Sequence, residues 1–382
     1  MIAITKAQAR RFMLLHHGLL GERRYVGQDG IRSFVHHVGA LQYDPVDICG
    51  KNADIVLCSR VLGYQKSDLS ELLYTHRKLI DFFDKNLCII PTEYFQTFLH
   101  EKLSGGYAEY YAQKGGEAVA KIKPLIYELI KQRGHVSSRE IDVKDSLVWD
   151  WGISTSVARA ALESMYFGGE LIIHHKKGTV KSYALTEDHI PSEILNAPLP
   201  YKTNAERDIW HIYRRIRALG MLWNKASDAW LGLRIKAAGR AAVFVDLLKS
   251  DKIVEISVDG IKEPLYVAVE DMETLEAAMR MDEYEPRTEF IAPLDSFMWD
   301  RKLIAALFNF EYKWEIYTPQ VKRQYGPYTL PILRGESLVG RIDMARKDGA
   351  MVINNIWMQD GERLEGEMKR DIDECLGRFC GF

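Results

Sequence analysis

Long apolar runs are missing from this sequence of 382 residues. No stretch reaches 18 consecutive apolar residues, the shortest run typical of a transmembrane helix, so we expect no membrane partner. Residues 1–20 have the pattern of an amphipathic helix and lack the continuous apolar core of a signal peptide. The sequence therefore predicts a cytoplasmic protein.

Cysteine is also scarce. The five cysteines are an odd number, and no two of them form a C-x-x-C pair: Cys49, Cys58, Cys88, Cys375 and Cys380. Disulfide frameworks use an even number of cysteines, and structural zinc sites use closely spaced pairs. We expect neither, and a reducing compartment is the simplest setting for the chain.

Cofactor motifs are absent as well. Without a G-x-x-x-x-G-K-[ST] loop or a dinucleotide fingerprint, the sequence indicates neither a nucleotide-hydrolysing motor nor a redox enzyme. Three histidine pairs invite a metal: His16-His17, His36-His37 and His174-His175. Adjacent side chains point to different faces of a helix or strand, and no carboxylate or cysteine stands at ligand spacing. We expect structural or surface roles for these histidines, with no metal and no cofactor.

A strong net charge is the last thing missing. The formal charge is −2, in a chain that is 47% hydrophobic and 27% charged. This composition is typical of a globular protein, and the length corresponds to two to four domains. A near-neutral net charge neither favours nor excludes a nucleic-acid partner, because the basic side chains that bind nucleic acid can be confined to one surface.

The clearest pattern lies in the middle of the chain. Residues 123–133 read as a helix, and a serine-capped turn leads to a short helix at 139–144. A third helix is capped by Ser154-Thr155-Ser156 and ends near Tyr166. Two strands, 170–173 and 180–185, then flank a basic loop. Three helices followed by a β-hairpin are typical of a winged helix, a DNA-binding motif.

The pattern recurs downstream. A helix is predicted at 209–219, and residues 239–243 resemble residues 157–161, which places Arg240 in the position of Arg159. A second hairpin, formed by 253–258 and 264–269, follows around an Asp-Gly turn. The sequence therefore predicts a second winged helix and an internal repeat.

The two ends of the chain differ from this repeat. The first third is mostly helical, with helices expected at 5–18 and 28–39. The last part carries a closing helix from about Gly361 and five strand-like runs, at 290–294, 314–317, 328–333, 338–344 and 351–356. We predict an α+β protein of tandem winged-helix (helix-turn-helix) modules followed by a C-terminal β-rich α+β domain. The predicted domains are a divergent winged-helix region at 1–118, winged helices at 119–192 and 193–272, and the α+β domain at 273–382.

Four short motifs stand outside the repeat. They are Gln42-x-Asp44, the D-x-x-x-W-D-R run from Asp295 to Arg301, the Y-T-P run at 317–319 and the K-R-Q-Y-G run at 322–326. In this order, and over nearly the whole chain, they resemble the winged-helix DNA glycosylase family of YcaQ (AlkX) and AlkZ. The Q-x-D motif alone would be weak, whereas the three C-terminal motifs are quite specific.

The resemblance implies a concave DNA-binding face made by three winged helices. It also implies a DNA repair enzyme that excises N7-alkylated purines from double-stranded DNA and, in some members, unhooks interstrand crosslinks. The family's catalytic pair falls on Gln42 and Asp44. Many members carry a His-Glu pair where this chain has Lys85 and Asn86, which leaves crosslink unhooking open.

The residue types suit this chemistry. Alkylation at N7 makes the purine cationic and a good leaving group, so the general acid of ordinary glycoside hydrolysis is not needed. Asp44 is expected to activate water and offset the sugar cation, while Gln42 holds the same water. A nucleophilic Lys85 would instead give Schiff-base chemistry, which we do not favour. The structural alternative for Asp44 is a helix N-cap followed by Pro45 at the first helical position.

The predicted DNA contacts are basic side chains of the recognition helix, the wing and the C-terminal domain, an aromatic ring of that domain, and Arg60 near the Q-x-D motif. They are Arg60, Arg159, Lys176, Lys177, Lys181, Lys322, Arg323 and Tyr325. Their structural alternatives are a solvated face, a strand-end turn and, for Arg60, an ion pair. The functional alternative is a non-catalytic regulator, which would usually dimerise on spaced half-sites. We expect a monomer.

Overall fold

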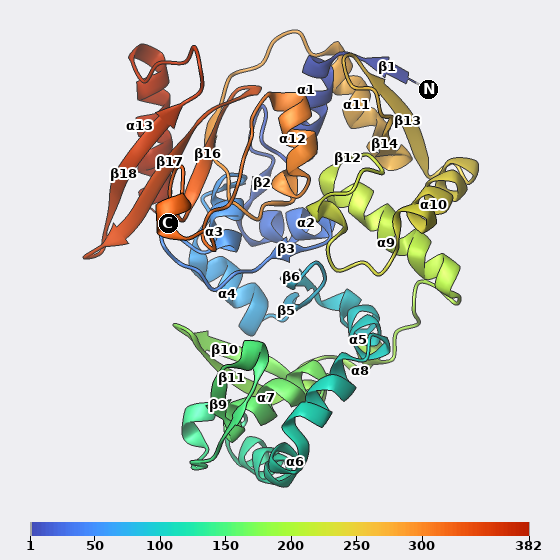
Figure 1. Cartoon of the computed structure of the whole chain (residues 1–382), viewed down its shortest axis with the longest axis vertical. Coiled ribbons are helices and arrows are strands. Elements are labelled where there is room, and N and C mark those ends of the chain that lie inside the picture. Colours follow the sequence, from blue (N-terminus) through green and yellow to red (C-terminus); the bar gives the residue numbers. More distant parts are fainter. Residues whose placement is uncertain (1, 382) are drawn as a thin grey trace. The chain divides into compact units, whose positions relative to one another are not determined.

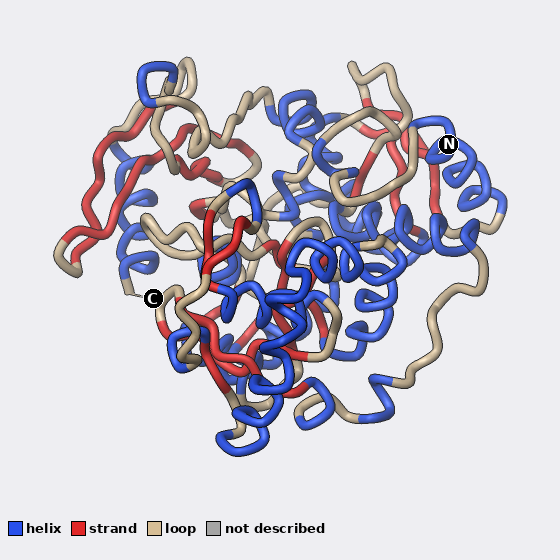
Figure 2. Tube along the Cα trace, turned by 60° about the horizontal axis from the view of Figure 1, so that its bottom comes forward, coloured by secondary structure: helices blue, strands red, loops and turns tan. Residues whose placement is uncertain are grey.

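The computed structural model describes residues 2–381, apart from the side chains of Tyr107, Trp151 and Cys380. The chain forms two compact units. The first comprises residues up to Leu69, residues 85–87 and the chain from Tyr201 onward, and the second comprises Ser70–Asp84 and Cys88–Pro200. Helices alternate with short strands throughout (Figures 1 and 2), so the prediction of a mixed α and β protein is confirmed. The boundaries between the four predicted domains stay a prediction.

The second unit holds the central pattern. Its helices and strands are β5 (Leu79–Phe83), most of β6 (Leu87–Pro91), α5 (Phe95–Ser104), α6 (Tyr107–Arg133), β7 (Val136–Ser137), β8 (Ser146–Val148), β9 (Ser154–Ser156), α7 (Val157–Phe167), β10 (Leu171–Lys177), β11 (Val180–Leu185) and α8 (Ser192–Leu195). Helix α4 (Lys66–Tyr74) crosses from the first unit into the second. Strand β11 lies between β10 and β7 in an antiparallel sheet.

Helix α7 shows why the sequence folds this way. The Ser156 hydroxyl accepts a hydrogen bond from Arg159 N at the start of the helix. The apolar side chains of Ala158, Ala161, Leu162 and Met165, which recur at helical spacing, are buried. The helix begins directly after the predicted cap of three residues, whereas the short helix expected at 139–144 is only a 3-10 turn at Ser138–Glu140.

The first unit repeats this arrangement. It contains α9 (Asn204–Leu219), β12 (Met221–Leu222), α10 (Ala237–Lys249), β13 (Ile253–Val258) and β14 (Leu265–Ala268). Strand β14 lies between β13 and β12, just as β11 lies between β10 and β7. The shared element order and strand pairing agree with the predicted repeat, while the assignment of both segments as winged helices stays a prediction.

The repeated arginines differ in their surroundings. Arg159 has a side chain that is 61% exposed, whereas Arg240 is buried and donates hydrogen bonds to Asn224 Oδ1 and to Ile235 O. Helix α9 ends at Gly220, whose φ of +80° brings its α-carbon against the ring of His16. A side chain at this position would collide with that ring, so the glycine is needed for both its conformation and its size.

The rest of the first unit comes from both ends of the chain. The N-terminal elements are β1 (Ile2–Ile4), α1 (Lys6–His16), β2 (Tyr25–Val26), α2 (Gly27–Val38), β3 (Leu41–Gln42), α3 (Asn52–Cys58) and β4 (Val61–Leu62). The C-terminal elements are α11 (Met272–Arg280), β15 (Thr288–Phe290), α12 (Arg301–Phe308), β16 (Thr329–Arg334), β17 (Ser337–Lys347), β18 (Ala350–Met358) and α13 (Gly366–Cys380). Both predicted N-terminal helices are therefore present.

The C-terminal strands form one antiparallel sheet in the order β15-β16-β17-β18. Four of the five predicted runs overlap these strands, but Trp314–Tyr317 lies in a loop, so the fifth prediction was wrong. Helix α12 was not predicted. Among the described helices, none is long and apolar enough to cross a bilayer.

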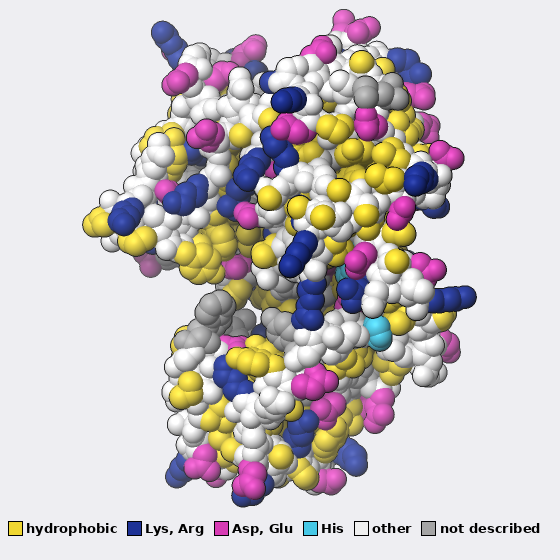
Figure 3. Space-filling model, turned by 45° about the vertical axis from the view of Figure 1, so that its right-hand side comes forward, with side chains coloured by type: hydrophobic (Ala, Val, Ile, Leu, Met, Phe, Trp, Pro, Cys, Tyr) yellow, Lys and Arg dark blue, Asp and Glu magenta, His cyan; other side chains and the backbone are white. Residues whose placement is uncertain are grey.

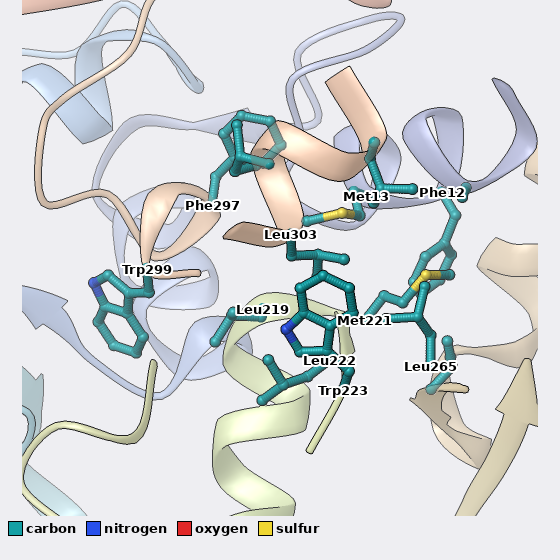
Figure 4. Close-up of a cluster of buried hydrophobic side chains, with 14 of the residues drawn as sticks. Phe12, Met13, Leu219, Met221, Leu222, Trp223, Leu265, Phe297, Trp299 and Leu303 are labelled. Atoms are coloured by element: carbon teal, nitrogen blue, oxygen red, sulfur yellow. The ribbon is translucent and has the colours of Figure 1, made fainter. Parts of the chain in front are cut away.

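One core joins the two ends of the chain. Phe12 and Met13 of α1 pack with Leu219 of α9, Leu265 of β14 and Leu303 of α12 (Figure 4). The histidines near this core have structural roles, as expected for these pairs. His16 and His17 are buried, and their rings donate to the carbonyls of Arg217 and Leu219.

A buried ion pair lies between the N-terminal helices and the C-terminal region. The Arg60 guanidinium and the Asp295 carboxylate are both fully buried, with Nη2 at 2.7 and 2.9 Å from the two carboxylate oxygens. The same guanidinium donates to His17 O and Val56 O, and it lies over the Phe34 ring. The N–H groups that do not face Asp295 are thus satisfied by two other segments of the unit, one at His17 and one at Val56 to Ser59.

Removing one partner of this pair is expected to destabilise the first unit strongly. Asp295→Ala leaves an uncompensated buried cation, which typically costs about 3–5 kcal/mol. Chemical denaturation of the purified variant measures the loss. Asp373→Ala, which breaks an exposed pair with Lys369 on α13, is the control and should change stability by less than about 1 kcal/mol. Equal losses in the two variants would contradict the role assigned to the buried pair.

Candidate active site

The segment after β3 carries Gln42 and Asp44. No helix begins at Pro45, since the chain is irregular from Tyr43 to Lys51 and α3 starts only at Asn52. Asp44 Oδ1 accepts a hydrogen bond from Val46 N at 2.8 Å, which closes a local turn. The alternative that Asp44 caps a helix is therefore wrong, and its carboxylate is not committed to a helix N-terminus.

Asn52 fixes the backbone of this segment. Its Nδ2 donates to Gln42 O at 2.9 Å, and its Oδ1 accepts from Leu294 N at 3.0 Å. Asn52 is fully buried, so both hydrogen bonds are shielded from water. The main chain of Gln42 is thereby tied to the residues that precede Asp295, the partner of Arg60.

The side chain of Gln42 is buried against a cation. Lys85 Nζ lies 3.4 Å from Gln42 Oε1 and 5.2 Å from the centre of the Trp299 ring. Tyr43 N donates to Leu87 O at 2.9 Å and so holds residues 85–87 beside this segment. An ammonium at Oε1 orients the amide, because a cation attracts the oxygen and repels the NH2 group.

Asp44 is half-buried, and burial raises the pKa of its carboxyl while the Val46 N–H bond lowers it. A tyrosine hydroxyl lies nearby. The pKa of Tyr328 is raised well above its usual value, mainly by burial, with Cys49 and Asp44 among the groups that add to the shift. Within the described part of the chain its hydroxyl has no hydrogen-bond partner, although the residue is fully buried. This is the kind of polar atom that a bound molecule can satisfy.

The C-terminal sheet meets the segment after Asp44. Arg346 N of β17 donates to Ile48 O at 2.8 Å. Burial raises the pKa of Asp343 on the same strand, and the Asp343 charge in turn helps to raise the pKa of Cys49 to about 12. Carboxylates from two parts of the chain therefore gather near Tyr328.

An ordered loop extends from this region to the surface. Trp314 contacts Tyr328 at 6.1 Å between ring centres and Tyr317 at 5.5 Å, and Tyr317 is 81% exposed. Val321 is 92% exposed. The Glu315 carboxylate accepts the backbone N–H groups of the three residues that close the loop, Gln324, Tyr325 and Gly326, at distances from 2.9 to 3.2 Å. Exposed apolar side chains on a fixed loop are typical of a contact surface.

The comparisons with known proteins place this geometry in context. A family model described as DNA glycosylase AlkZ-like matches residues 35–382. The chain belongs to this family of DNA glycosylases. Among solved structures, the DNA glycosylase AlkZ of Streptomyces sahachiroi has a similar fold, with a TM-score of 0.65 at 14% identity, covering 100% of this chain and 98% of that chain. The family resemblance is confirmed, and the protein is an enzyme that acts on DNA rather than a non-catalytic regulator.

The predicted DNA contacts of this glycosylase fall into two groups. Arg159, Lys177 and Lys322 have exposed side chains and stay predictions. Lys181 is half-buried, and burial lowers its pKa, but it too stays a prediction. Basic and acidic side chains are interspersed on the face seen in Figure 3, and this face shows no single large basic patch.

In the second group, two predictions require correction. Arg60 is fully buried in its ion pair and cannot reach a phosphate, and Lys176, with a side chain only 8% exposed, pairs with Asp81 at 2.6 Å. Arg323 donates to Thr318 O, and the Tyr325 ring lies under the Arg341 guanidinium at 3.9 Å. Arg323 and Tyr325 are half-buried, and their assignment as DNA contacts stays a prediction.

Sequence reasoning missed several residues of this site. Lys85 was noted only as a departure from the family, and Trp299 only as part of a motif. Tyr328 and Asp343 were counted as strand residues. Asp343 could have been noticed from the sequence, because an acidic residue is unusual in a strand that is mostly apolar. In the structure, strand β17 is buried from Leu338 to Met344. No sequence signal distinguishes Tyr328 from a core tyrosine.

The exposed loop leads to a binding prediction. Stacking of an aromatic side chain on a base is typically worth about 1–3 kcal/mol, so Tyr317→Ala should weaken DNA binding by that amount. Fluorescence anisotropy with a labelled duplex at fixed salt measures the affinity. Tyr110→Ala removes another exposed tyrosine and should leave it unchanged. If a Tyr317→Ala, Val321→Ala double variant bound as tightly as wild type, the loop would not be a DNA contact.

Proposed function

We propose that this glycosylase hydrolyses the N-glycosidic bond of N7-alkylated purines in double-stranded DNA, acting as a monomer without a covalent enzyme intermediate. Gln42 and Asp44 are the proposed catalytic residues. The observation that carries the proposal is the state of Asp44: a half-buried carboxylate, released from helix capping, two residues from an amide that is held by a cation.

The lesion decides how much chemistry the protein must supply. An N7-alkylated purine carries a positive charge, so the electrons of the breaking C1′–N9 bond neutralise the departing base. The remaining need is to stabilise the sugar cation and to deliver water to C1′. A single carboxylate meets both needs, because its negative charge offsets the oxocarbenium ion and it accepts a proton from the attacking water.

The two side chains have complementary roles in this proposal. Asp44 Oδ1 is engaged by Val46 N, so Oδ2 is assigned as the oxygen that takes the water proton. Gln42 Oε1 faces Lys85 Nζ, so the amide NH2 group is assigned as the donor to the water oxygen. Lys85 then acts as a positioning residue for Gln42, not as a nucleophile.

The acidic groups around Asp44 support a cationic substrate. Asp44, Asp47 and Asp343 all lie close enough to this region to perturb the pKa of Tyr328 or Cys49. Negative charge attracts a cationic base, whereas a neutral base of the same shape gains no such attraction. Bulky N7 adducts and N7-linked crosslinks share the same charge, so crosslink unhooking is an extension of the same proposal.

The first test is the release of 7-methylguanine from a duplex oligonucleotide. Asp44→Asn removes the base and should slow single-turnover release at least about 100-fold, within the usual range for general-base catalysis. Asp373→Asn removes the charge of an exposed carboxylate on α13 and serves as the control. Wild-type activity retained in Asp44→Asn would exclude the proposed role, and release absent from folded wild type would exclude this substrate.

The mechanism also predicts a pH dependence. Only the deprotonated Asp44 accepts a proton, and burial raises its pKa, so release should decline as the pH falls through a value above 3.9, the usual pKa of an aspartic acid. Single-turnover rates from pH 4 to pH 8 measure this acid limb. The limb should vanish in Asp44→Asn, and rates that increased steadily with acidity would contradict base catalysis.

A Schiff base provides a separate check on the role of Lys85. We expect no covalent complex with DNA when wild type is treated with borohydride during the reaction, since no amine attacks C1′ in this scheme. Lys85→Met should lower the rate by loosening Gln42 without abolishing release. A trapped complex that disappeared in Lys85→Met would show lyase chemistry and replace the proposed mechanism.

A further inference from the structure

Three imidazoles meet in the second unit, whereas the residues assigned to base release belong to the first unit. His135 lies in the turn between α6 and β7, and His174 and His175 lie on β10. One ring nitrogen from each can be chosen so that all three lie within 4.8 Å of one another. The ring centre of His135 is 4.6 Å from that of His174 and 4.9 Å from that of His175.

A β-bulge brings the adjacent histidines together. Ile173 pairs with Tyr183 and His175 pairs with Ser182, so His174 is an extra residue on β10. In a regular strand the two side chains would point to opposite faces. Here the Nδ1 atoms of His174 and His175 are 2.8 Å apart. The expectation that these neighbours diverge was therefore wrong at this pair.

Arg77 holds the bulge in place. Its guanidinium donates to Ile173 O at 2.9 Å and to His174 O at 3.1 Å, the two carbonyls where the register shifts. Arg77 has a positive φ of 52°, an uncommon conformation for a residue with a side chain. The backbone beneath the two imidazoles is thus fixed by a third segment of the unit.

The third imidazole also suits ligand chemistry. His135 Nδ1 is buried and has no hydrogen-bond partner within the described part of the chain. A buried ring nitrogen without a hydrogen-bond partner can donate its lone pair to a metal ion.

We propose that His135, His174 and His175 bind one divalent transition-metal ion. Neutral imidazoles prefer zinc, copper and nickel over magnesium and calcium, which prefer oxygen ligands. Three histidines leave one position of a tetrahedral site for water or for His189, whose ring centre lies 5.2 Å from that of His174. Coordination would replace the short Nδ1–Nδ1 contact with two metal–nitrogen bonds.

The ion would join the end of α6 to the hairpin of β10 and β11. That hairpin carries Lys177, a predicted DNA contact. Fixing it through three side chains would restrict its motion and so favour one geometry for binding DNA. No step of base release involves the ion, so this inference is independent of the roles proposed for Gln42 and Asp44.

Cobalt(II) is a suitable probe, because it takes zinc sites and absorbs visible light when its coordination is tetrahedral. Full-length protein, first treated with a chelator, is titrated with Co²⁺. We expect a visible absorption that saturates at one equivalent, is displaced by Zn²⁺ and is accompanied by a higher melting temperature. His135→Ala and His175→Ala should each weaken binding at least about tenfold, as expected for a lost contact to the metal.

The control is His76→Ala, which removes an exposed histidine from the same unit and should leave the titration unchanged. Circular dichroism confirms that each variant is folded, and His175→Gln tests the ligand with less change in volume. Failure of folded wild type to bind Co²⁺ or Zn²⁺ at micromolar concentrations would overturn the proposal. So would binding that is equally strong in His135→Ala, His175→Gln and His76→Ala.

Discussion

The buried pair of Arg60 and Asp295 is the interaction on which the first unit depends most. Two segments more than 200 positions apart in the chain meet at a guanidinium and a carboxylate that no water reaches. Such a pair gains little over well-packed apolar residues, but a misaligned pair is costly. It therefore specifies one arrangement of the N-terminal helices against the C-terminal region, and alternatives that separate the two charges are disfavoured.

The geometry of the candidate active site depends on that arrangement. Asn52 links the main chain of Gln42 to Leu294, the residue before Asp295, so the segment that carries Gln42 and Asp44 is positioned by the same contact region as the ion pair. Tyr328, just before β16, then lies near Asp44, and Asp343 of β17 lies near Cys49. A site assembled in this way can bury a carboxylate far enough to raise its pKa.

The repeat shows how one pattern serves different purposes. Both copies have a helix, a short strand, a second helix and a hairpin, with the short strand beside the second strand of the hairpin. Arg159 is exposed in one copy, whereas Arg240 is buried in the other. Likewise, the histidines of α1 donate to backbone carbonyls in the core, while those of β10 face one another at a bulge. Surroundings, and not residue type, decide whether such side chains are available to a ligand.

The sequence by itself determined the class of protein, the family, the central repeat and the segment that carries Gln42 and Asp44. Periodicity and capping are local properties, so α7, its buried face and the hairpin after it were predictable. Only the tertiary structure decided that Asp44 caps no helix, that Arg60 is buried and that His174 and His175 lie side by side. Each depends on contacts between distant segments or on a one-residue shift in strand register, and local sequence patterns contain no information about either.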